Sequence, residues 1–212
     1  FVSGLRGTGS KDIVIEETFV PEYRAADVAE MRVGQSPGRS IHGSCNYLIP
    51  HTTMLSYTLA APVLGMAQGA VDVFEEQVVG RVTYTTGDKL GENSSVHIRL
   101  SEAEAEVHSA RLIMKNDGEE VFGQIRRGEM PSINQRARCR RNQAYVAKLA
   151  VRAVDRLFEA SGGHVLFNSN PMQRFHRDAH AASHHFGIHW ETLAEEYGRV
   201  RLGLELKNPG RI

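Results

Sequence analysis

The sequence predicts a mainly α-helical fold, in which an antiparallel bundle of long helices follows a short segment of β-strands. Three observations support this prediction. Apolar residues recur at helical spacing from about residue 51 onward, whereas the first fifty residues are rich in glycine, proline and short β-branched runs. Hydrophobic residues make up 41% of the 212 residues, which is enough for a core. We therefore expect strands and a linker at residues 1–50 and a helical domain at residues 51–212.

The first segment should contain two short strands. Residues 12–16 and 18–21 are β-branched runs flanked by turn residues, the usual pattern of a strand. Residues 4–10 include three glycines and predict a turn before the strands. Glycine and proline recur in residues 33–45, which predicts a loop that leads into the helical domain.

The first two long helices are expected at residues 53–79 and 94–116. Pro62 should kink the first, and Gly65 and Gly69 would let another helix approach closely on one face. The second helix carries an apolar row whose members step by four and three, as in helices that pack against partner helices. The apolar row consists of Val96, Leu100, Ala103, Val107, Ala110 and Met114.

A further helical stretch is expected at residues 119–127 and a third long helix at residues 135–160. The third helix should end at Ser161-Gly162-Gly163, because glycine readily adopts the left-handed conformation of a helix C-cap. Asn170 is a good N-cap and Pro171 suits the first helical position, so a fourth helix should begin there.

The fourth helix should run to about residue 187, and a last helix is expected at residues 190–202. Four or five long helices with short connections favour an antiparallel bundle.

Composition excludes several classes of protein. Lys and Arg together number 25, as do Asp and Glu, so no net positive charge attracts nucleic acid, and the arginine-rich run 136–141 is interpreted as a solvated turn of helix. Cys45 and Cys139 are interpreted as free thiols in a reducing compartment, which favours the cytoplasm. Residues 54–71 lack charge but include polar residues, so we expect a core helix and no membrane span. The chain does not begin with Met, and we interpret its start as internal to a longer protein.

Five histidines fall within residues 176–189, and their spacing leaves three interpretations open. His176 and His180, four residues apart, suit a metal ion, but no acidic partner is evident nearby in the sequence. For these two a solvated helix face is the favoured interpretation. His185 lies at the edge of the apolar face, near Asp178, and fits acid–base chemistry best, with His184 as its rival.

Four short motifs follow one another along the chain. The turn at residues 4–10 precedes a strand that ends in Val20-Pro21, and Arg81 follows the first long helix. Gly162-Gly163 separates two later helices, and residues 173–178 spell QRFHRD. In this order the motifs resemble the acyl-CoA dehydrogenase superfamily over essentially the whole chain.

The resemblance implies an N-terminal helical domain, a middle β-barrel and a C-terminal four-helix bundle, of which this chain would hold the end of the barrel and the bundle. In that family the flavin lies between the barrel and the bundles of two subunits. The resemblance places Arg81 at the cofactor of a neighbouring subunit, and Ser161, Gly162 and Gly163 at the cofactor as well. Glu159 stands where dehydrogenases often carry a cofactor-contacting glutamine, so reduced FMN is as good an expectation as reduced FAD.

The residues after the QRFHRD motif distinguish two branches of the superfamily. Many dehydrogenases carry a catalytic glutamate there, but residues 179–187 contain no carboxylate. His185, seven residues after Asp178, instead resembles the oxygenase components of two-component flavin monooxygenases. In those enzymes a separate reductase supplies FMNH2 or FADH2, which forms a C4a-hydroperoxide with oxygen. The resemblance therefore implies an aromatic hydroxylase that needs no metal, with His185 as the catalytic residue that deprotonates a phenol or positions the peroxide.

Two alternatives remain open from the sequence. One is an acyl-CoA dehydrogenase whose catalytic base has moved elsewhere, and the other is a non-catalytic helical domain that serves in assembly. For the lead interpretation we expect a flavin reductase and a small aromatic substrate as partners. The apolar row and the Gly65/Gly69 face offer more packing surface than one small bundle needs, so we also expect a homo-oligomer, a tetramer built as a dimer of dimers.

Overall fold

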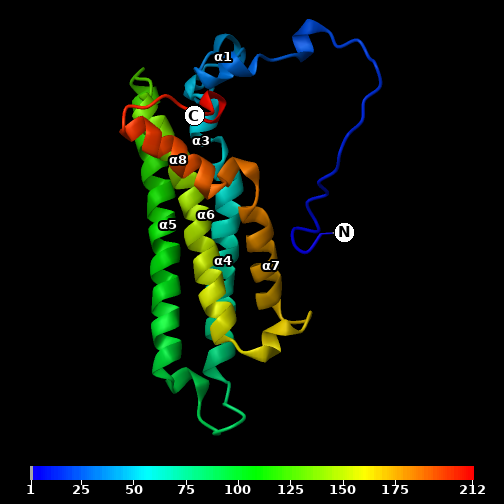
Figure 1. Ribbon diagram of the computed structural model, residues 1–212, viewed down its shortest axis with the longest axis vertical. Coiled ribbons are helices and arrows are strands. Elements are labelled where there is room, and N and C mark those ends of the chain that lie inside the picture. Colours follow the sequence, from blue (N-terminus) through cyan, green and yellow to red (C-terminus); the bar gives the residue numbers. More distant parts are fainter. Residues whose placement is uncertain (1) are drawn as a thin grey trace.

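The computed structural model describes residues 2–212, and its long helices form an up-and-down bundle (Figure 1). Four long helices lie side by side with alternating direction: α4 (Tyr57–Val79), α5 (Ser94–Arg126), α6 (Ile133–Ala160) and α7 (Pro171–Ser183). The shorter α8 (Trp190–Arg201) packs against α6 near the end of the bundle where α3 (His51–Leu55) begins. The predicted mainly helical fold is confirmed.

Short helices and 3-10 turns join these elements. They are η1 (Glu22–Arg24), α1 (Val28–Arg32), α2 (Gly38–Ile41), η2 (Cys45–Leu48), η3 (Leu90–Glu92), η4 (Gly163–Leu166), η5 (Phe186–Ile188) and η6 (Pro209–Arg211). Two of them, η4 and η5, flank α7 and carry residues of the predicted site.

The core lies around α6, which packs against α4, α5, α7 and α8. Fully buried side chains from three of these helices meet there, among them Val63 and Phe74 of α4, Val107 of α5 and Leu157 of α6. Alanines line many of the contact positions, so the helix axes can approach closely. Most of the apolar row of α5 is buried in this core, and its Leu100 and Met114 are half-buried against it.

One helical stretch, His51–Val79, is long and apolar enough to cross a membrane by length and composition alone. In the fold, its apolar face packs into the centre of the bundle, where Ala60, Ala67 and Val71 are buried. The stretch behaves as the core helix that the sequence predicts.

The predicted strands at residues 12–16 and 18–21 are wrong. Within residues 2–212 the structure has no strand, only one antiparallel bridge between Val82 and Lys89. The apolar side chains of Ile13, Val14 and Phe19 are exposed. A strand needs a neighbour to satisfy its backbone hydrogen bonds, and no described segment lies beside these residues to provide one.

Three predicted helix boundaries also differ. The first helix is interrupted at Ser56, and α4 then continues through Pro62. The segments expected at residues 94–116 and 119–127 form one helix, α5. The fourth helix ends at Ser183 and not near residue 187, because the chain leaves helical geometry at His185 to form η5.

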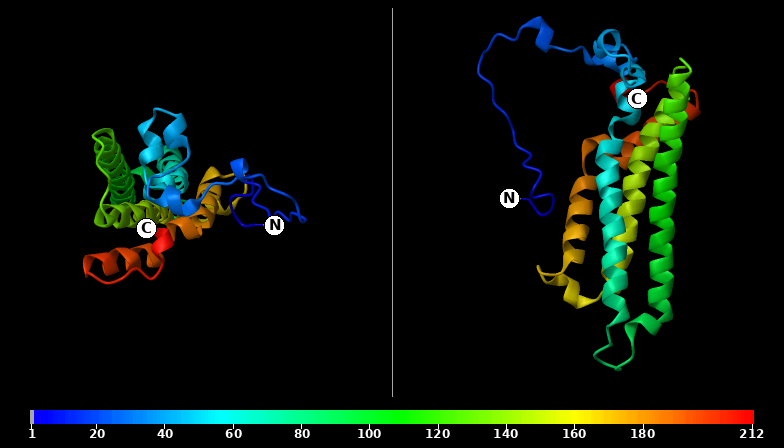
Figure 2. Two further views of the ribbon diagram at one scale, coloured as in Figure 1. Left: turned by 90° about the horizontal axis from the view of Figure 1, so that it is seen from above. Right: turned by 180° about the vertical axis from the view of Figure 1, so that it is seen from behind.

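The N-terminal turn lies against α7. The amide of Leu5 donates to Oδ1 of Asp178 at 2.7 Å, and Arg177 donates to the carbonyl of Ser3 at 2.8 Å. A Cβ at Gly4 would lie only 2.2 Å from the carbonyl oxygen of Arg177, so this contact requires glycine. The chain then loops away from the bundle and returns at α1 (Figure 2).

Candidate functional site

His185 is the N-terminal capping residue of η5. Its Nδ1 accepts a hydrogen bond from the amide of Gly187 at 3.0 Å. Its exposed ring stacks on the ring of Phe186, with 4.6 Å between the ring centroids. An Nδ1 that accepts carries no proton, so the neutral imidazole has its proton on Nε2. The ring therefore presents an N–H donor, and no free lone pair, at its other edge.

This geometry differs from the predicted one in two ways. His185 lies beyond the end of α7, so its orientation follows from the η5 turn and not from the phase of the helix. Asp178, expected beside it, instead accepts the hydrogen bond from Leu5. The rival His184 is the C-cap of α7, where its Nδ1 donates to the carbonyl of His180 at 2.8 Å.

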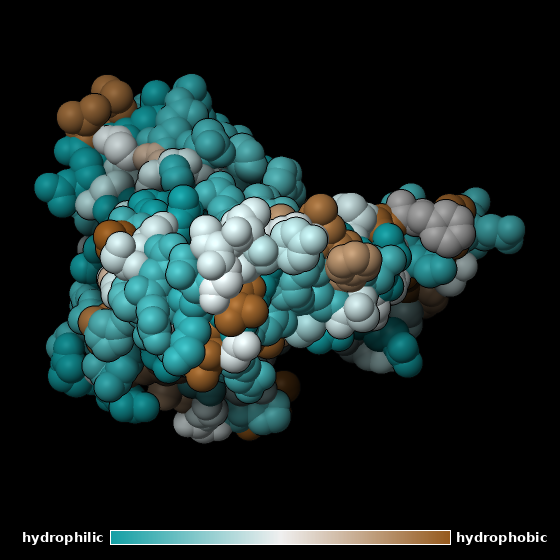
Figure 3. All heavy atoms as spheres, turned by 90° about the horizontal axis from the view of Figure 1, so that it is seen from below, coloured by the Kyte–Doolittle hydropathy of each residue, from teal (hydrophilic) through white to brown (hydrophobic). Residues whose placement is uncertain are grey.

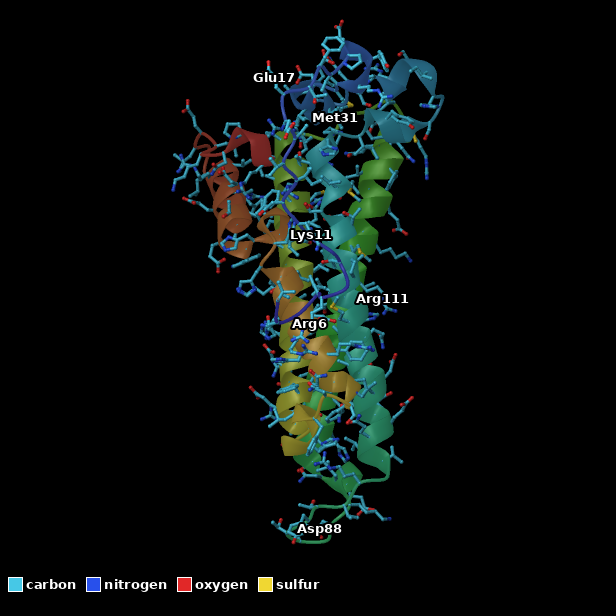
Figure 4. All side chains as sticks on the ribbon, turned by 90° about the vertical axis from the view of Figure 1, so that its right-hand side faces the viewer. Arg6, Lys11, Glu17, Met31, Asp88 and Arg111 are labelled. Carbon is cyan, nitrogen blue, oxygen red and sulfur yellow. The ribbon has the colours of Figure 1, made fainter. Side chains whose placement is uncertain are left out.

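A cavity of about 730 Å³ opens beside His185, and its walls come from three parts of the chain. The N-terminal segment forms one wall, and Figure 4 shows Arg6 and Lys11 on this segment as it passes along the bundle. The other walls are largely apolar: Leu59, Pro62 and Met66 of α4, with Ala181, Ala182, His184 and His185 at the end of α7. Among the described residues that line the cavity, none carries a carboxylate.

The residues expected at the cofactor gather in a second place, at the start of η4. The guanidinium of Arg81 donates to the carbonyl of Ser161 at 2.5 Å, while the hydroxyl of Ser161 donates to Leu157 within α6. Gly162 has a φ of +70°, and a Cβ there would lie 3.5 Å from Arg81. Gly163 follows as the first residue of η4.

The structure thus brings Arg81, Ser161, Gly162 and Gly163 together. An exposed glycine backbone beside a fixed guanidinium suits an anionic or planar polar ligand, so these residues fit a flavin. His164 and Gln77 support the turn: His164 bonds through Nδ1 to Ser161 and through Nε2 to Gln77. The sequence analysis did not identify these two residues, since their pairing is not local.

His185 and the Arg81–Gly162 turn lie at opposite ends of α7. A helix of 13 residues spans about 20 Å, so one chain does not join the two sets of residues into a single site. Figure 3 looks onto the end of the bundle where the turn lies and shows apolar side chains among hydrophilic ones. Val79, Leu166 and Phe167 are exposed apolar residues of the neighbouring segments.

The interpretation of His176 and His180 as solvated is wrong. Nε2 of His180 lies 2.7 Å, and Nε2 of His176 3.3 Å, from Oδ1 of Asp155 on α6, and His176 also stacks on Phe158. These groups hold α7 against α6. Burial and the neighbouring His180 lower the pKa of His176, while Asp155 acts in the opposite direction. The acidic partner that the sequence did not show is therefore Asp155, from another helix.

The arginine-rich run 136–141 is not a solvated turn. Arg140 is only 4% exposed, and Arg136 and Arg138 are half-buried. Arg138 pairs with Glu120 of α5, and Arg136 donates to the carbonyls of Arg32 and Ile212. The sequence did not reveal that these arginines are buried or half-buried, because their partners lie far away along the chain.

Comparison with known proteins identifies the family. Residues 57–190 match the family model described as acyl-CoA dehydrogenase, C-terminal domain. The chain is 34% identical over 206 residues to the oxygenase subunit HsaA of a flavin-dependent monooxygenase of Rhodococcus jostii, covering 97% of this chain and 54% of that protein. It is 28% identical to the oxygenase component of p-hydroxyphenylacetate 3-hydroxylase of Acinetobacter baumannii, covering 97% of this chain and 49% of that protein.

The solved structure of the 3-HSA hydroxylase from Rhodococcus sp. RHA1 superimposes with a TM-score of 0.92 and 31% identity, and covers 100% of this chain and 55% of that one. The chain therefore spans about half the length of the relatives that it matches. From the family match, the sequence identity and the helical bundle together, we conclude that the chain belongs to the acyl-CoA dehydrogenase family through that family's C-terminal domain.

Proposed function

We propose that the protein to which this chain belongs is the oxygenase component of a flavin-dependent monooxygenase that hydroxylates a phenolic substrate. The observation that carries the proposal is His185 on the wall of a largely apolar cavity whose described lining includes no carboxylate. Removal of a proton from the α-carbon of a thioester calls for a carboxylate base in this family, and the described lining of the cavity includes no carboxylate. Two relatives that match nearly the whole chain are named as the oxygenase components of a resorcinol hydroxylase and a p-hydroxyphenylacetate 3-hydroxylase, and a third as the oxygenase subunit of a flavin-dependent monooxygenase; these names support the proposal.

A bound reduced flavin would supply the two electrons needed to split O2, so that one oxygen atom enters a ring C–H bond and the other leaves as water. Arg81, Ser161, Gly162 and Gly163 would hold this flavin, as FMNH2 or FADH2, and a separate reductase would supply it. No metal takes part in this proposal. We also propose that the protein acts in the cytoplasm, as its two free thiols favour.

His185 acts, in this proposal, on the oxygen of the phenol. The phenol gives its proton to bulk water before it enters the cavity, and the Nε2–H of His185 then donates a hydrogen bond to the phenolate oxygen. This bond stabilises the phenolate, in which the ring carbon beside the oxygen is more nucleophilic. The Gly187 amide fixes the ring in this tautomer. The apolar side chains of Leu59, Pro62 and Met66 keep water from the reacting ring.

The overall proposal is tested with the full-length protein, a flavin reductase, NADH and a panel of phenols. Hydroxylated product is expected for at least one phenol. Rapid consumption of NADH and oxygen with hydrogen peroxide as the sole product would count against it. Bleaching of bound oxidised FAD by an acyl-CoA would instead support the dehydrogenase alternative, and failure to bind any flavin would support the assembly domain.

Substitution of His185 tests the role of the histidine. A lost hydrogen bond to a charged group costs about 1.5–3 kcal/mol, so His185→Ala should slow hydroxylation roughly 10- to 100-fold at unchanged flavin oxidation. His185→Gln retains an N–H donor near the position of Nε2 and should recover part of this rate. His184→Ala is the matched control and should have a smaller effect, because that ring bonds back to α7. Equal losses in the Ala and Gln variants would indicate a general base and not a donor.

A further inference from the structure

A second pocket, of about 610 Å³, lies on the other side of His185. It shares Leu59 and His185 with the apolar cavity, and its remaining walls come from α1, α3, α6, the η5 turn and the C-terminal residues 207–211. Its charged lining is of one sign: Arg32, Arg140, Lys207 and Arg211 face it, and none of the described lining residues is Asp or Glu. Lys207 pairs with Glu195, so the three arginines are the cations of the pocket that remain to be examined for ion pairs.

Arg140 is the most deeply buried of the three and has no counter-ion among the residues that the structure describes. Its Nε donates to the carbonyl of Arg211 at 2.7 Å, and its Nη1 donates to the hydroxyl of Ser56 at 2.6 Å and to the amide oxygen of Gln143. All three acceptors are neutral. Burial, together with the charge of Arg211, lowers the pKa of Arg140 to about 10. A buried guanidinium surrounded only by neutral acceptors and another cation is stabilised when an anion approaches.

The other two arginines are also without ion pairs among the described residues. Arg211 is held by the carbonyl of Phe186 at 3.0 Å and lies over the Phe186 ring. Arg32 packs against Gly210, where an added Cβ would lie 3.0 Å from its guanidinium, and its buried Nε has no hydrogen-bond partner. The three guanidinium groups therefore come from α1, α6 and η6, and the fold holds them together without a carboxylate.

We propose that this arginine-lined pocket binds an oxyanion, a carboxylate or a phosphate, carried by a molecule whose body lies against His185. Arginine binds planar oxyanions through paired N–H donors, and the pocket supplies three guanidinium groups that no described carboxylate pairs with. Because the pocket meets the apolar cavity at His185 and Leu59, one molecule can place a ring in the cavity and an acidic group among the arginines.

Two sources offer this chemistry. One is the acidic substituent of an aromatic substrate, which would make the substrate a phenolic acid; this assignment rests on the proposed function. The other is the phosphate of the flavin. The binding of an oxyanion by the arginines depends on neither choice, so it can be measured without turnover.

The test uses equilibrium binding to the full-length protein. Dissociation constants are measured by calorimetry for 4-hydroxyphenylacetate and for its neutral counterpart 4-methylphenol, without flavin. Reduced FMN and reduced riboflavin are compared in the same way under anaerobic conditions. Arg211→Gln removes a charge at the half-buried edge of the pocket. Arg140→Lys retains the positive charge but not the paired N–H donors of the guanidinium. Arg201→Gln, on the exposed end of α8, is the matched control.

If the substrate carries the anion, Arg211→Gln should raise the dissociation constant of the acid about tenfold and that of 4-methylphenol less than twofold. If the flavin phosphate is the anion, the same substitution should weaken the binding of reduced FMN and not that of reduced riboflavin. Either result supports the oxyanion pocket, and Arg201→Gln should change neither. The proposal is overturned if the native protein has similar dissociation constants for the acid and the neutral phenol, and also for reduced FMN and reduced riboflavin. It is overturned as well if Arg211→Gln raises the dissociation constants of both members of each pair equally. If the protein prefers the anionic ligand but hydroxylates no phenol, the proposed function is refuted, whereas the oxyanion pocket is still supported.

Discussion

At the level of single residues, Asp117 explains why α5 is one long helix. Its buried carboxylate accepts a hydrogen bond from Tyr57 of α4 at 2.7 Å and two from Asn142 of α6, at 2.9 and 3.1 Å. The sequence Asn116-Asp117-Gly118 resembles a helix end, and we predicted one there. The carboxylate instead bonds to two other helices, so it does not compete for the backbone of α5.

Removal of one donor should measure the strength of this contact. Tyr57→Phe removes only the hydroxyl and deprives the buried carboxylate of one donor, so the free energy of unfolding should fall by about 1.5–3 kcal/mol. Urea denaturation of the full-length protein provides the measurement. Tyr84, which is fully exposed, supplies the control: Tyr84→Phe should leave the midpoint unchanged. A similar midpoint for both variants would show that the Asp117 contact contributes little.

His185 shows what sequence reasoning can and cannot supply at this scale. The sequence identified the residue as the catalytic candidate, and this role stays a prediction; the structure places His185 on the wall of a cavity. Its orientation was not predictable, because it depends on the hydrogen bond to Gly187, which forms only after the helix has ended. Arg140 was missed for a related reason: its burial depends on Ser56 and on the C-terminal segment, both far away in the sequence.

At the level of elements, α6 and α7 are joined by Asp155 and the two histidines four residues apart. His176 is largely neutral in the folded state near pH 7, because burial and the adjacent His180 lower its pKa and outweigh the opposing effect of Asp155. The unfolded chain therefore takes up a proton at this position at a higher pH than the folded one does.

A pH dependence of stability follows. As the pH falls from 7 through the usual histidine range toward 5.5, protonation favours the unfolded state, and this part of the stability is lost. His176→Gln should flatten the fall of the melting temperature over this interval, whereas His108→Gln, on the exposed face of α5, should not. The effect is modest, since the His176 side chain is one-third exposed. An unchanged pH profile for His176→Gln would contradict the role given to this histidine.

The helices themselves were largely predictable, because periodicity and capping are local. Asn170 accepts a hydrogen bond from the amide of Met172, and Pro171 opens α7 as predicted. The strands were not predictable in the same way. The β-branched runs at residues 12–21 carry the right composition, but a strand also requires a partner strand, and the described residues provide none.

At the level of the whole molecule, the predicted tetramer remains a prediction. The apolar row of α5 is largely used within the bundle, so it no longer argues for a partner. Two other features favour a partner subunit. One is the set of exposed apolar residues Val79, Leu166 and Phe167, and the other is the separation of the Arg81–Gly162 turn from His185. A second subunit that covers this end could bring the turn to its neighbour's flavin.

Sedimentation of the full-length protein at micromolar concentration should give the mass of a tetramer. Phe167→Glu places a charge at the proposed contact and should shift the mass toward smaller species, whereas Leu202→Glu, exposed at the end of α8 and away from this contact, should leave the mass unchanged. A native protein that sediments as a stable monomer would rule out the tetramer.

Gly69 of α4 faces the ring of Phe175 on α7, and a Cβ at Gly69 would lie 2.7 Å from that ring. The same two helices carry opposite walls of the apolar cavity, with Leu59 and Met66 on one side and Ala181 and Ala182 on the other. The Gly69–Phe175 contact therefore acts as a spacer that sets the width of a cavity it does not line. Gly69→Ala should push the walls apart and shift the preference among phenols toward bulkier rings, as a comparison of kcat/KM across a size series would show. We therefore expect that one hydrogen-for-methyl exchange outside the cavity alters the substrate range without a substitution of any side chain that lines it.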